Sequence, residues 1–436
     1  MISNKINSGI NGNIKIPGDK SISHRSIIIP SISNGISEVN NILMSDDVLH
    51  TMNALKALGV KIINENNKLL IYGKGLNSLT KAPQNIYLGN SGTSARLLTG
   101  LLASQSFNST IEGDKSLSLR PMNRIMDPLK IMGGKFNNTS GRLPLKIIGK
   151  KLKNSNIDIE IPSAQIKSGL ILAAINTEGV SKIIEKNITR DHTENMLKSF
   201  GAEISIEKKG QETSIMINGK KELKSNNIDV PSDLSSSAFF IVAALINKGS
   251  KICMQNININ PTRDGILIAL KKMGGKIEIK NRRTFSGETV ADLEVEHTEL
   301  KGCELDSEIA KLMIDEYPIL SIAAAFANGP SLFKGLGELK VKESDRLELI
   351  RLNLLRCGCE CEVKNDDLLI KPSKVYLPKN FKIRTDFDHR IAMSFAIMGS
   401  KIGNLIIEDT ESINTSFPNF NNIFNSTGGK FLWKKS

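Results

Sequence analysis

The chain has 436 residues, of which 40% are hydrophobic and 24% charged, a composition typical of a soluble globular protein rather than a disordered or fibrous one. Lys and Arg outnumber Asp and Glu by 58 to 45, a net charge of +13, but aromatic residues make up only 5%, which argues against a nucleic-acid surface. No apolar run reaches the roughly 18–20 residues that cross a bilayer, no hydrophobic signal segment is visible, and five cysteines do not suggest a disulfide framework. We therefore expect a cytoplasmic protein that binds no membrane.

Six segments share one pattern, in which a polar or charged opening precedes an apolar helix and a glycine-containing stop. In chain order they cover residues 18–32, 89–103, 162–175, 231–246, 314–327 and 387–398. Their starts lie about 70–80 residues apart, which is longer than a solenoid repeat and fits one small βα unit each. Because helix N-termini carry unpaired N–H groups and partial positive charge, six that converged would form an anion-binding site.

A second, amphipathic helix is predicted in five of these repeats, over residues 48–58, 121–132, 193–200, 264–273 and 344–357. Each ends at a glycine, as expected for a helix stop, and a strand with alternating apolar residues follows, for example at 276–280. The pattern predicts about six units of two helices and several short strands, divided into two bodies of three near residues 229–233.

The openings of the first helices are rich in cations. Lys20, Ser21 and Arg25 lie at one helix start, where lysine and a bidentate arginine suit phosphate or carboxylate; an ordinary serine cap with solvated charges is the alternative. Residues 89–96 form a glycine-rich turn that can bring backbone N–H groups to an anion, but the lysine of a Walker A motif is missing. Both features indicate a small anionic ligand.

Arginine recurs at the starts of the second helices. Its positive charge is unfavourable there because of the helix dipole, so its presence requires an explanation. Anion binding is one explanation, and an ion pair with an adjacent aspartate is the other, which is favoured for Arg263 beside Asp264. Asp315 and Glu343 stand out among these cations and fit acid/base chemistry on phosphorylated or carboxylated substrates. No zinc-type spacing appears, so we expect no metal and structural roles for Cys357, Cys359 and Cys361.

Taken together, nine short motifs closely resemble the EPSP synthase (3-phosphoshikimate 1-carboxyvinyltransferase) family, in order and over almost the whole chain. They are residues 18–25 (GDKSISHR), 89–93 (GNSGT), 120–122 (RPM), 162–165 (PSAQ), 167–169 (KSG), 190–194 (RDHTE), 315–318 (DEYP), 342–346 (KESDR) and 388–390 (DHR). The resemblance implies an α/β fold, an inside-out α/β barrel with two domains, each of three β-α-β-α-β-β repeat units. The N-terminal domain would take residues 18–231, and the discontinuous C-terminal domain would take residues 1–17 plus 232–436.

The reaction that the resemblance implies transfers the enolpyruvyl group of phosphoenolpyruvate to the 5-hydroxyl of shikimate 3-phosphate, in a monomer without cofactor or metal. Asp315 would accept the hydroxyl proton, and Glu343 with Lys20 would deliver a proton to the methylene carbon. Phosphoenolpyruvate would be bound by Lys20, Gly92, Arg120, Gln165, Arg346 and Arg390. Shikimate 3-phosphate would be bound by Lys20, Ser21, Arg25, Ser163, Ala164, Gln165, Arg190, Asp315 and Lys342.

Two positions depart from the pattern of many members. Thr415 stands where many have a lysine that contacts phosphoenolpyruvate, and Ala164 replaces a second serine, both as in the subgroup with the RDHTE and DEYP forms. Two alternatives remain. A UDP-N-acetylglucosamine enolpyruvyl transferase shares the fold, but it has an asparagine at the position that corresponds to Ser21. It also usually has a cysteine in the loop that corresponds to residues 117–119 (LSL). A basic nucleic-acid-binding protein would explain the charge but not the repeat with polar helix starts.

Overall fold

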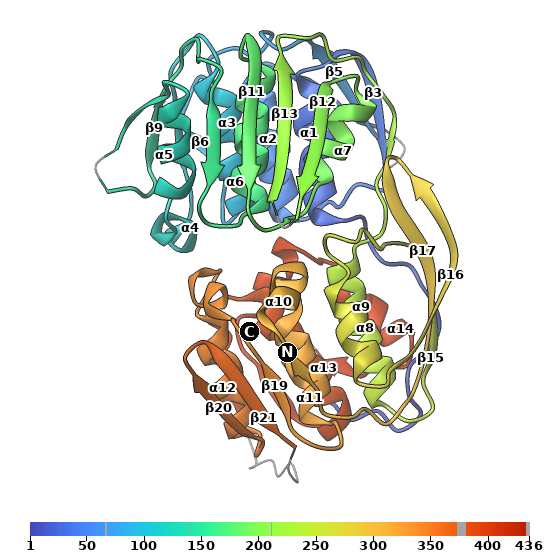
Figure 1. The fold of residues 1–436 in the computed structure, drawn as a ribbon. Coiled ribbons are helices and arrows are strands. Elements are labelled where there is room, and N and C mark those ends of the chain that lie inside the picture. The colour runs from blue at the N-terminus through green and yellow to red at the C-terminus, as the bar shows by residue number, and fades with distance from the viewer. Residues whose placement is uncertain (66–67, 139, 211, 373–380, 433–436) are drawn as a thin grey trace. The chain divides into compact units, whose positions relative to one another are not determined.

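The computed structural model describes residues 1–65, 68–138, 140–210, 212–372 and 381–432 (Figure 1). Its chain divides into two compact units, neither of which is contiguous in sequence. The first unit comprises Gly18–Pro231 with Phe285–Glu288, and the second comprises Met1–Pro17, Ser232–Thr284 and Thr289–Ser436. Each unit has a hydrophobic core of its own.

Within the described residues, each unit is built around three apolar helices. They are α1 (Lys20–Ser31), α3 (Gly92–Ala103) and α6 (Ala164–Ile175) in the first unit, and α8 (Leu234–Ile246), α11 (Tyr317–Ala325) and α13 (His389–Ile402) in the second. Every residue of α8 is buried, and so are all residues of α6 from Ile166 to Ile175. A helix that is apolar on all sides needs protein around it, so these helices form the two cores. The six predicted segments are confirmed as helices.

The polar openings cap these helices, as their residue types predicted. The side chains of Asp19, Ser91, Ser163, Asp233 and Asp388 accept hydrogen bonds from backbone N–H groups of the first helical turn. Helix α11 differs, because a 3₁₀ turn over Ile314–Glu316 precedes it and no side-chain cap forms. Asp315 therefore lies in a tight turn at the start of a core helix.

The second helices are amphipathic and shorter. They are α2 (Asp46–Ala57), α5 (Asn123–Ile131) and α7 (His192–Ser199) in the first unit, and α9 (Gly265–Lys272), α12 (Arg346–Arg356) and α14 (Phe420–Ser426) in the second. Five end at the predicted glycines, whose φ values of 84–91° lie in the left-handed region that favours glycine. Helix α14 was missed by the sequence pattern, because its seven residues are too few to show a periodicity. Two short helices, α4 (Lys115–Leu119) and α10 (Ser307–Met313), complete the set among the described residues.

The described strands form six four-stranded sheets, three in each unit. In the first unit, in spatial order, the sheets are β14 (Ile228–Asp229), β3 (Asn34–Asn40), β5 (Lys68–Lys74) and β4 (Lys61–Glu65); β6 (Ile86–Tyr87), β7 (Ser109–Glu112), β9 (Leu145–Ile148) and β8 (Lys135–Asn137); and β10 (Asn156–Ile159), β11 (Gly179–Glu185), β13 (Glu212–Gly219) and β12 (Glu203–Lys209). In the second unit they are β16 (Lys276–Phe285), β17 (Glu288–Glu296), β15 (Lys251–Asn258) and β2 (Asn11–Ile14); β18 (Glu304–Leu305), β19 (Ser331–Phe333), β21 (Asp367–Lys371) and β20 (Glu360–Lys364); and β22 (Lys382–Ile383), β23 (Leu405–Ile407), β1 (Ile2–Ser3) and β24 (Phe431–Leu432).

Each sheet contains one parallel pair, and the rest of the sheet pairs antiparallel, as with β10 and β11 followed by β13 and β12. The apolar helices pack together inside each unit, and the strands lie outside them (Figure 1). Three repeats are contiguous, for example β10-α6-β11-α7-β12-β13, which is the predicted β-α-β-α-β-β order. The predicted fold class, an inside-out α/β architecture of repeated units, is confirmed. Among the described residues, no helix is both long and apolar enough to cross a membrane.

Candidate active site

Lys20 lies at the start of α1, immediately after the cap Asp19. Its Nζ lies 2.5 Å from Oδ2 of Asp47, which belongs to the first turn of α2, and the Lys20 side chain is 19% exposed. The ion pair holds the ammonium group at the surface end of the helix instead of letting it extend into solvent. An anion at the amino end of α1 can bind this ammonium in competition with Asp47.

Arg25, one turn further along α1, is buried and bonded on three sides. Its Nε donates to Thr193 Oγ1 at 2.6 Å, Nη1 donates to the Ser21 carbonyl at 2.7 Å, and Nη2 donates to Ser168 Oγ at 2.7 Å. Burial lowers the pKa of Arg25 to about 10, and the positive charge of Arg190 contributes to the same shift. A buried guanidinium beside a second cation gains stability from any anion that joins it.

Gly92, Arg120 and Gln165 meet where α3 and α6 begin. Gln165 Oε1 accepts a hydrogen bond from Arg96 Nη1 at 2.8 Å, and Gln165 Nε2 donates to Thr93 Oγ1 at 3.0 Å. A Cβ atom on Gly92 would lie 2.8 Å from Arg96 Nη1, 3.0 Å from Arg120 Nη1 and 3.8 Å from Gln165 Oε1. Position 92 therefore has to be small for the two guanidinium groups to stand where they do.

Ser163, Ala164 and Arg190 complete the residues predicted in the first unit. Ser163 caps α6, and Ala164 is the first residue of that helix, with a carbonyl that accepts from Ser168 Oγ at 2.6 Å. Arg190 is half-buried in the turn before α7, near enough for its charge to affect the pKa of Arg25. The predicted residues of this unit thus lie at the amino ends of α1, α3 and α6 and in the loops beside them.

In the second unit, the buried Arg346 forms the centre of an ionic cluster. Its Nε donates to Asp388 Oδ2 at 2.8 Å, Nη2 to Glu343 Oε2 at 2.5 Å, and Nη1 to Asp315 Oδ1 at 3.3 Å. Lys342 Nζ lies 3.3 Å from the same Asp315 oxygen. Burial by itself lowers the pKa of Arg346, but Asp388, Glu343 and Asp315 outweigh burial and raise that pKa above its ordinary value. One guanidinium therefore orients both carboxylates that the sequence singled out.

Arg390 joins the same cluster from the first turn of α13. Its Nη1 donates to the Asp315 carbonyl at 3.1 Å and lies 3.7 Å from Glu316 Oε1. Asp388 caps α13 by accepting from the Arg390 backbone N–H at 2.9 Å. The structure thus brings together all the site residues predicted in this unit: Asp315, Lys342, Glu343, Arg346 and Arg390.

Two other sequence predictions can be compared with their surroundings. The sequence favours an ion pair between Arg263 and the adjacent Asp264, but the ion pair found joins Arg263 Nη2 to Asp233 Oδ1, the cap of α8, at 3.0 Å. Because residues that follow each other at a helix start point in different directions, the more distant aspartate is better placed. Thr415, the position of departure from the family pattern, has its Oγ1 3.4 Å from His389 Nδ1.

Several buried ionic residues received no role from the sequence. Lys167 is 1% exposed, and its Nζ lies 2.9 Å from both Glu185 Oε1 and Glu194 Oε1 and donates to the Thr189 carbonyl at 3.1 Å. Burial alone lowers the pKa of Lys167, but Glu194 and Glu185 reverse the effect and raise it. A single charge within the otherwise apolar α6 was the signal that could have revealed this cluster, since such a charge needs buried partners.

His24 lies between Lys20 and Arg25 on α1 and is fully buried. Its Nδ1 is 2.7 Å from Thr51 Oγ1 and 3.4 Å from Ser94 Oγ, whereas Nε2 has no hydrogen-bond partner within the described residues. Burial, together with the positive charges of Lys20 and Arg25, holds the pKa of His24 well below its ordinary value of 6.5. The imidazole is therefore neutral in the folded protein.

The neutral state of His24 predicts a loss of stability in acid. Below about pH 6.5 the unfolded chain takes up a proton at His24 that the folded chain does not. The free energy of unfolding therefore decreases by up to about 1.4 kcal/mol for each unit by which the pH is lowered. Urea unfolding at pH 7.5, 6.5 and 5.5 measures this slope, and a His24→Asn variant, which keeps a polar partner for Thr51, should have a flatter one. Equal slopes for the two proteins would contradict the prediction.

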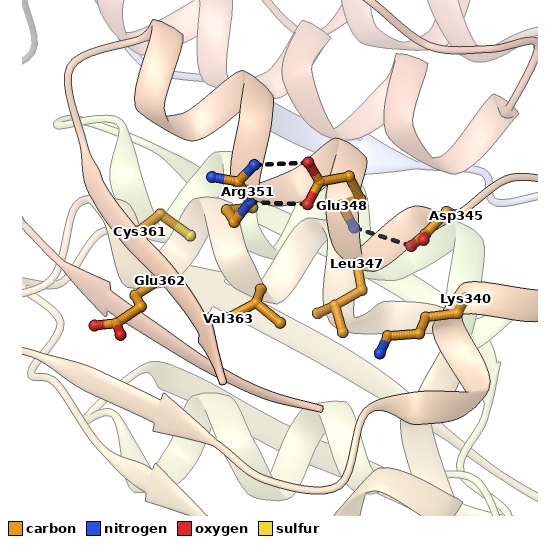
Figure 2. A pocket seen from close by; sticks show the side chains of 8 residues that line it. All are labelled: Lys340, Asp345, Leu347, Glu348, Arg351, Cys361, Glu362 and Val363. Carbon is orange, nitrogen blue, oxygen red and sulfur yellow. Dashed lines mark hydrogen bonds and ion pairs between the residues drawn. The ribbon is translucent and has the colours of Figure 1, made fainter. Parts of the chain in front are cut away.

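A pocket of about 430 Å³ lies beside α12 and β20 in the second unit. Its described lining contains none of the predicted site residues. Among its charged side chains, Arg351 pairs with Glu348 (Figure 2), and Lys340 pairs with Asp366 outside the lining. Arg351 donates to both carboxylate oxygens of Glu348, at 2.8 and 2.6 Å, and Asp345 accepts from the Glu348 backbone. Burial, with Cys359 nearby, raises the pKa of the Cys361 thiol to about 12, which makes it unreactive. Among the described residues, no group of three or more His, Cys, Asp or Glu could hold a metal ion.

Comparisons with known proteins show which family the chain belongs to. The chain is 43% identical over 419 residues to the 3-phosphoshikimate 1-carboxyvinyltransferase of Vesicomyosocius okutanii, covering 96% of this chain and 95% of the relative. It is 43% identical over 431 residues to the protein of that name from Zymomonas mobilis, covering 97% and 95%. Neither the UDP-N-acetylglucosamine alternative nor the nucleic-acid alternative is favoured by these relatives.

Solved structures give the same result for the fold. The EPSP synthase of Acinetobacter baumannii superposes with a TM-score of 0.86 at 39% identity, covering 98% of each chain. The enolpyruvyl transferase NikO of Streptomyces tendae superposes with a TM-score of 0.77 at 14% identity, covering 98% of this chain and 97% of the other, and shares the fold. The family model of EPSP synthase (3-phosphoshikimate 1-carboxyvinyltransferase) matches residues 5–424. The chain therefore belongs to the EPSP synthase family.

Proposed function

We propose that this protein transfers the enolpyruvyl group of phosphoenolpyruvate to the 5-hydroxyl of shikimate 3-phosphate, in the shikimate pathway of aromatic amino-acid synthesis. The products are 5-enolpyruvylshikimate 3-phosphate and inorganic phosphate. One observation supports this function most strongly: almost the full length of the chain matches the family. In addition, cations of the family motifs lie at the amino ends of core helices. Both substrates are anions, and such helix ends with fixed cations bind anions.

The first unit would supply most of the groups that bind the substrates. We assign Lys20, Ser21, Arg25, Ser163, Ala164, Gln165 and Arg190 to shikimate 3-phosphate, and Lys20, Gly92, Arg120 and Gln165 to phosphoenolpyruvate. Arg25 and Arg190 are cations near each other, which suits a phosphate dianion. Gln165 bonds Arg96 and lies near position 92, which supports its assignment to both ligands, at the place where they would meet.

The second unit would supply the acid/base groups. Asp315, which with Lys342 also binds shikimate 3-phosphate, accepts the proton of the 5-hydroxyl as its oxygen attacks C2 of phosphoenolpyruvate. Glu343, aided by Lys20, protonates the methylene carbon. The resulting tetrahedral adduct expels phosphate and returns a methyl proton to Glu343, and the hydroxyl proton held by Asp315 leaves with the phosphate. Arg346 and Arg390 bind phosphoenolpyruvate and stabilise the charge of the departing phosphate. The bonds from Arg346 to Asp315 and Glu343 support these roles, because they orient both carboxylates.

Phosphate release measured with both substrates tests the function. We expect release only when shikimate 3-phosphate and phosphoenolpyruvate are both present, with one enolpyruvyl product formed per phosphate. Omission of either substrate is the control. Release with UDP-N-acetylglucosamine in place of shikimate 3-phosphate, without release from the proposed pair, would overturn the proposal in favour of the sister activity.

The contacts at Gly92 lead to a separate prediction. In a Gly92→Ala variant the new methyl group displaces Arg96 and Arg120, whose flexible ends stand within 3.0 Å of it. Because only the ends of two side chains move, the fold should tolerate the change, whereas the KM for phosphoenolpyruvate should rise about tenfold, equivalent to about 1.4 kcal/mol of binding. Steady-state kinetics with each substrate varied in turn measures the effect; a rise confined to the KM for shikimate 3-phosphate would contradict it.

We also propose that the two compact units are the two enolpyruvyl transferase domains, and that the protein acts as a monomer in the cytoplasm. The crossings near residues 17–18 and 231–232 and the separate cores support the domain assignment. All five cysteines are free thiols, which suits a reducing compartment. Size-exclusion chromatography with light scattering tests the monomer, and fractionation of the producing cells tests the location.

A further inference from the structure

Arg25 is held by neutral groups, although it is a buried cation. Its side chain is 3% exposed in the folded first unit, and its described hydrogen-bond partners are two hydroxyls and one backbone carbonyl. The carboxylates of Glu194, Asp19 and Glu288 act on its pKa as nearby charges. A hydroxyl fixes the direction of an N–H bond without neutralising the guanidinium, so Arg25 keeps its charge for a ligand.

The two hydroxyls can serve only as acceptors toward Arg25. Thr193 Oγ1 donates its proton to Ser168 Oγ at 2.6 Å, and Ser168 Oγ donates its own to the Ala164 carbonyl at 2.6 Å. Because a hydroxyl has a single proton, both oxygens turn lone pairs toward the guanidinium. The hydrogen bonds therefore run in one direction, from Arg25 through Thr193 and Ser168 to the first residue of α6.

This arrangement leaves part of Arg25 available. Three N–H groups are bonded, one on each guanidinium nitrogen, to Thr193, Ser21 and Ser168. Of the five N–H groups of an arginine, one on Nη1 and one on Nη2 then have no bond within the described residues. The guanidinium therefore keeps two N–H donors that the oxygens of a phosphate or carboxylate can accept.

The sequence neighbours of the two hydroxyl residues join the same two helices. Lys167 precedes Ser168 on α6, and Glu194 follows Thr193 on α7; their charged atoms are 2.9 Å apart, and both side chains are 1% exposed. A buried ion pair at this position holds the two helices in register, so that the adjacent hydroxyls face Arg25. The register of α6 and α7 thus decides the direction of the guanidinium on α1.

We propose that Thr193 and Ser168 are positioning residues, which hold Arg25 so that its two remaining N–H groups bind an anionic group of shikimate 3-phosphate. The inference rests on the proposed function, because it concerns one of the two substrates named there. Neither hydroxyl is assigned a contact with the substrate; both act through Arg25.

Thr193→Val, which removes the hydroxyl and keeps the shape, tests the proposal. We expect the dissociation constant of shikimate 3-phosphate, measured by titration calorimetry, to rise about tenfold or more, because a charge-assisted hydrogen bond is lost. Thr193→Ser should restore binding, and Ser168→Ala should weaken it as Thr193→Val does. The KM for phosphoenolpyruvate should stay within about twofold of the parent value.

The matched control is Thr99→Val on α3. Thr99 is also a fully buried threonine, and its hydroxyl donates to a backbone carbonyl, that of Ala95, at 2.6 Å. This variant loses a buried hydroxyl without touching Arg25, so its affinity for shikimate 3-phosphate should equal that of the parent protein. Equal losses in Thr99→Val and Thr193→Val would show a general packing effect and overturn the proposal.

A double-mutant cycle separates positioning from packing. In an Arg25→Gln background, Thr193→Val should cause no further loss of affinity, because the group that Thr193 positions is absent. A tenfold loss in both backgrounds would overturn the proposal. Failure of the proposed function is recognised separately, since the parent protein would then release no phosphate from the two substrates. If the parent turns over and the variants bind normally, the positioning role alone is overturned.

Discussion

Replacing Arg346 with methionine should lower the free energy of unfolding of the second unit by about 3–5 kcal/mol and abolish turnover. Methionine fills much of the space of the arginine stem but leaves Asp388, which is fully buried, without its charged partner. An uncompensated buried carboxylate is costly, and Glu343 and Asp315 lose the guanidinium that orients them at the same time. Urea unfolding monitored by circular dichroism measures the stability, and phosphate release measures the turnover.

The same helix provides a matched control. Arg351 also forms an ion pair on α12, with Glu348, but both side chains of that pair are partly exposed, at 30% and 45%. Since exposed pairs contribute little, Arg351→Met should change the free energy of unfolding by less than about 1 kcal/mol and leave turnover intact. The losses of stability and turnover in Arg346→Lys should lie between those of Arg346→Met and Arg351→Met. One ammonium cannot reach three carboxylates as the forked guanidinium does. Similar losses for Arg346→Met and Arg351→Met would refute this account of the cluster.

Replacing Asp315 with asparagine should reduce kcat by about 10²–10⁴-fold, the usual contribution of a general base. Asparagine has the same shape and still accepts hydrogen bonds from Lys342 and Arg346, but it cannot take up the proton of the 5-hydroxyl. The affinity for shikimate 3-phosphate should change much less than kcat. Asp306→Asn, at the exposed start of α10, is the control and should behave as the parent protein does.

Glu343→Gln should produce a loss of similar size with an additional signature. If Glu343 protonates the methylene carbon, the parent enzyme working in D₂O should incorporate deuterium at that carbon, and the glutamine variant should do so far more slowly. Mass spectrometry of the enolpyruvyl product and of residual phosphoenolpyruvate measures the exchange. Full exchange in the Glu343→Gln variant would assign the proton transfer to another group.

The helices and their limits could be predicted from the sequence because they depend on local information. Polar caps such as Asp19 and glycine stops such as Gly59 act within one turn of the residues they cap. An all-apolar segment such as 234–246 has no favourable alternative to burial. The same locality explains why α14 was missed: it is short, and its sequence FNNIFNS offers neither a periodicity nor charged residues.

The composition of the site could be predicted only in part. Lys20, Arg25, Asp315, Glu343 and Arg346 stand out as charged residues where helices begin, a feature visible in one dimension. The sequence does not show which residues bond to them. The hydroxyls of Thr193 and Ser168 reach Arg25 from 168 and 143 residues away. Both residues lie in motifs that the sequence singled out, but nothing in those motifs shows that their hydroxyls bond Arg25. Likewise, Asp388 could be read as a cap of α13, but its bond to Arg346 depends on how α12 and α13 pack.

The sequence by itself determined the repeat, the helix ends and the residue types at them, because each follows from contacts within a few residues. Only the tertiary structure decided how the sheets are completed. Strand β14 joins β3 across almost the whole first unit, β2 joins β15, and β1 lies between β23 and β24 from the far end of the chain. Such short strands gain stability only from backbone hydrogen bonds to distant partners, and no periodicity within two to four residues can reveal them.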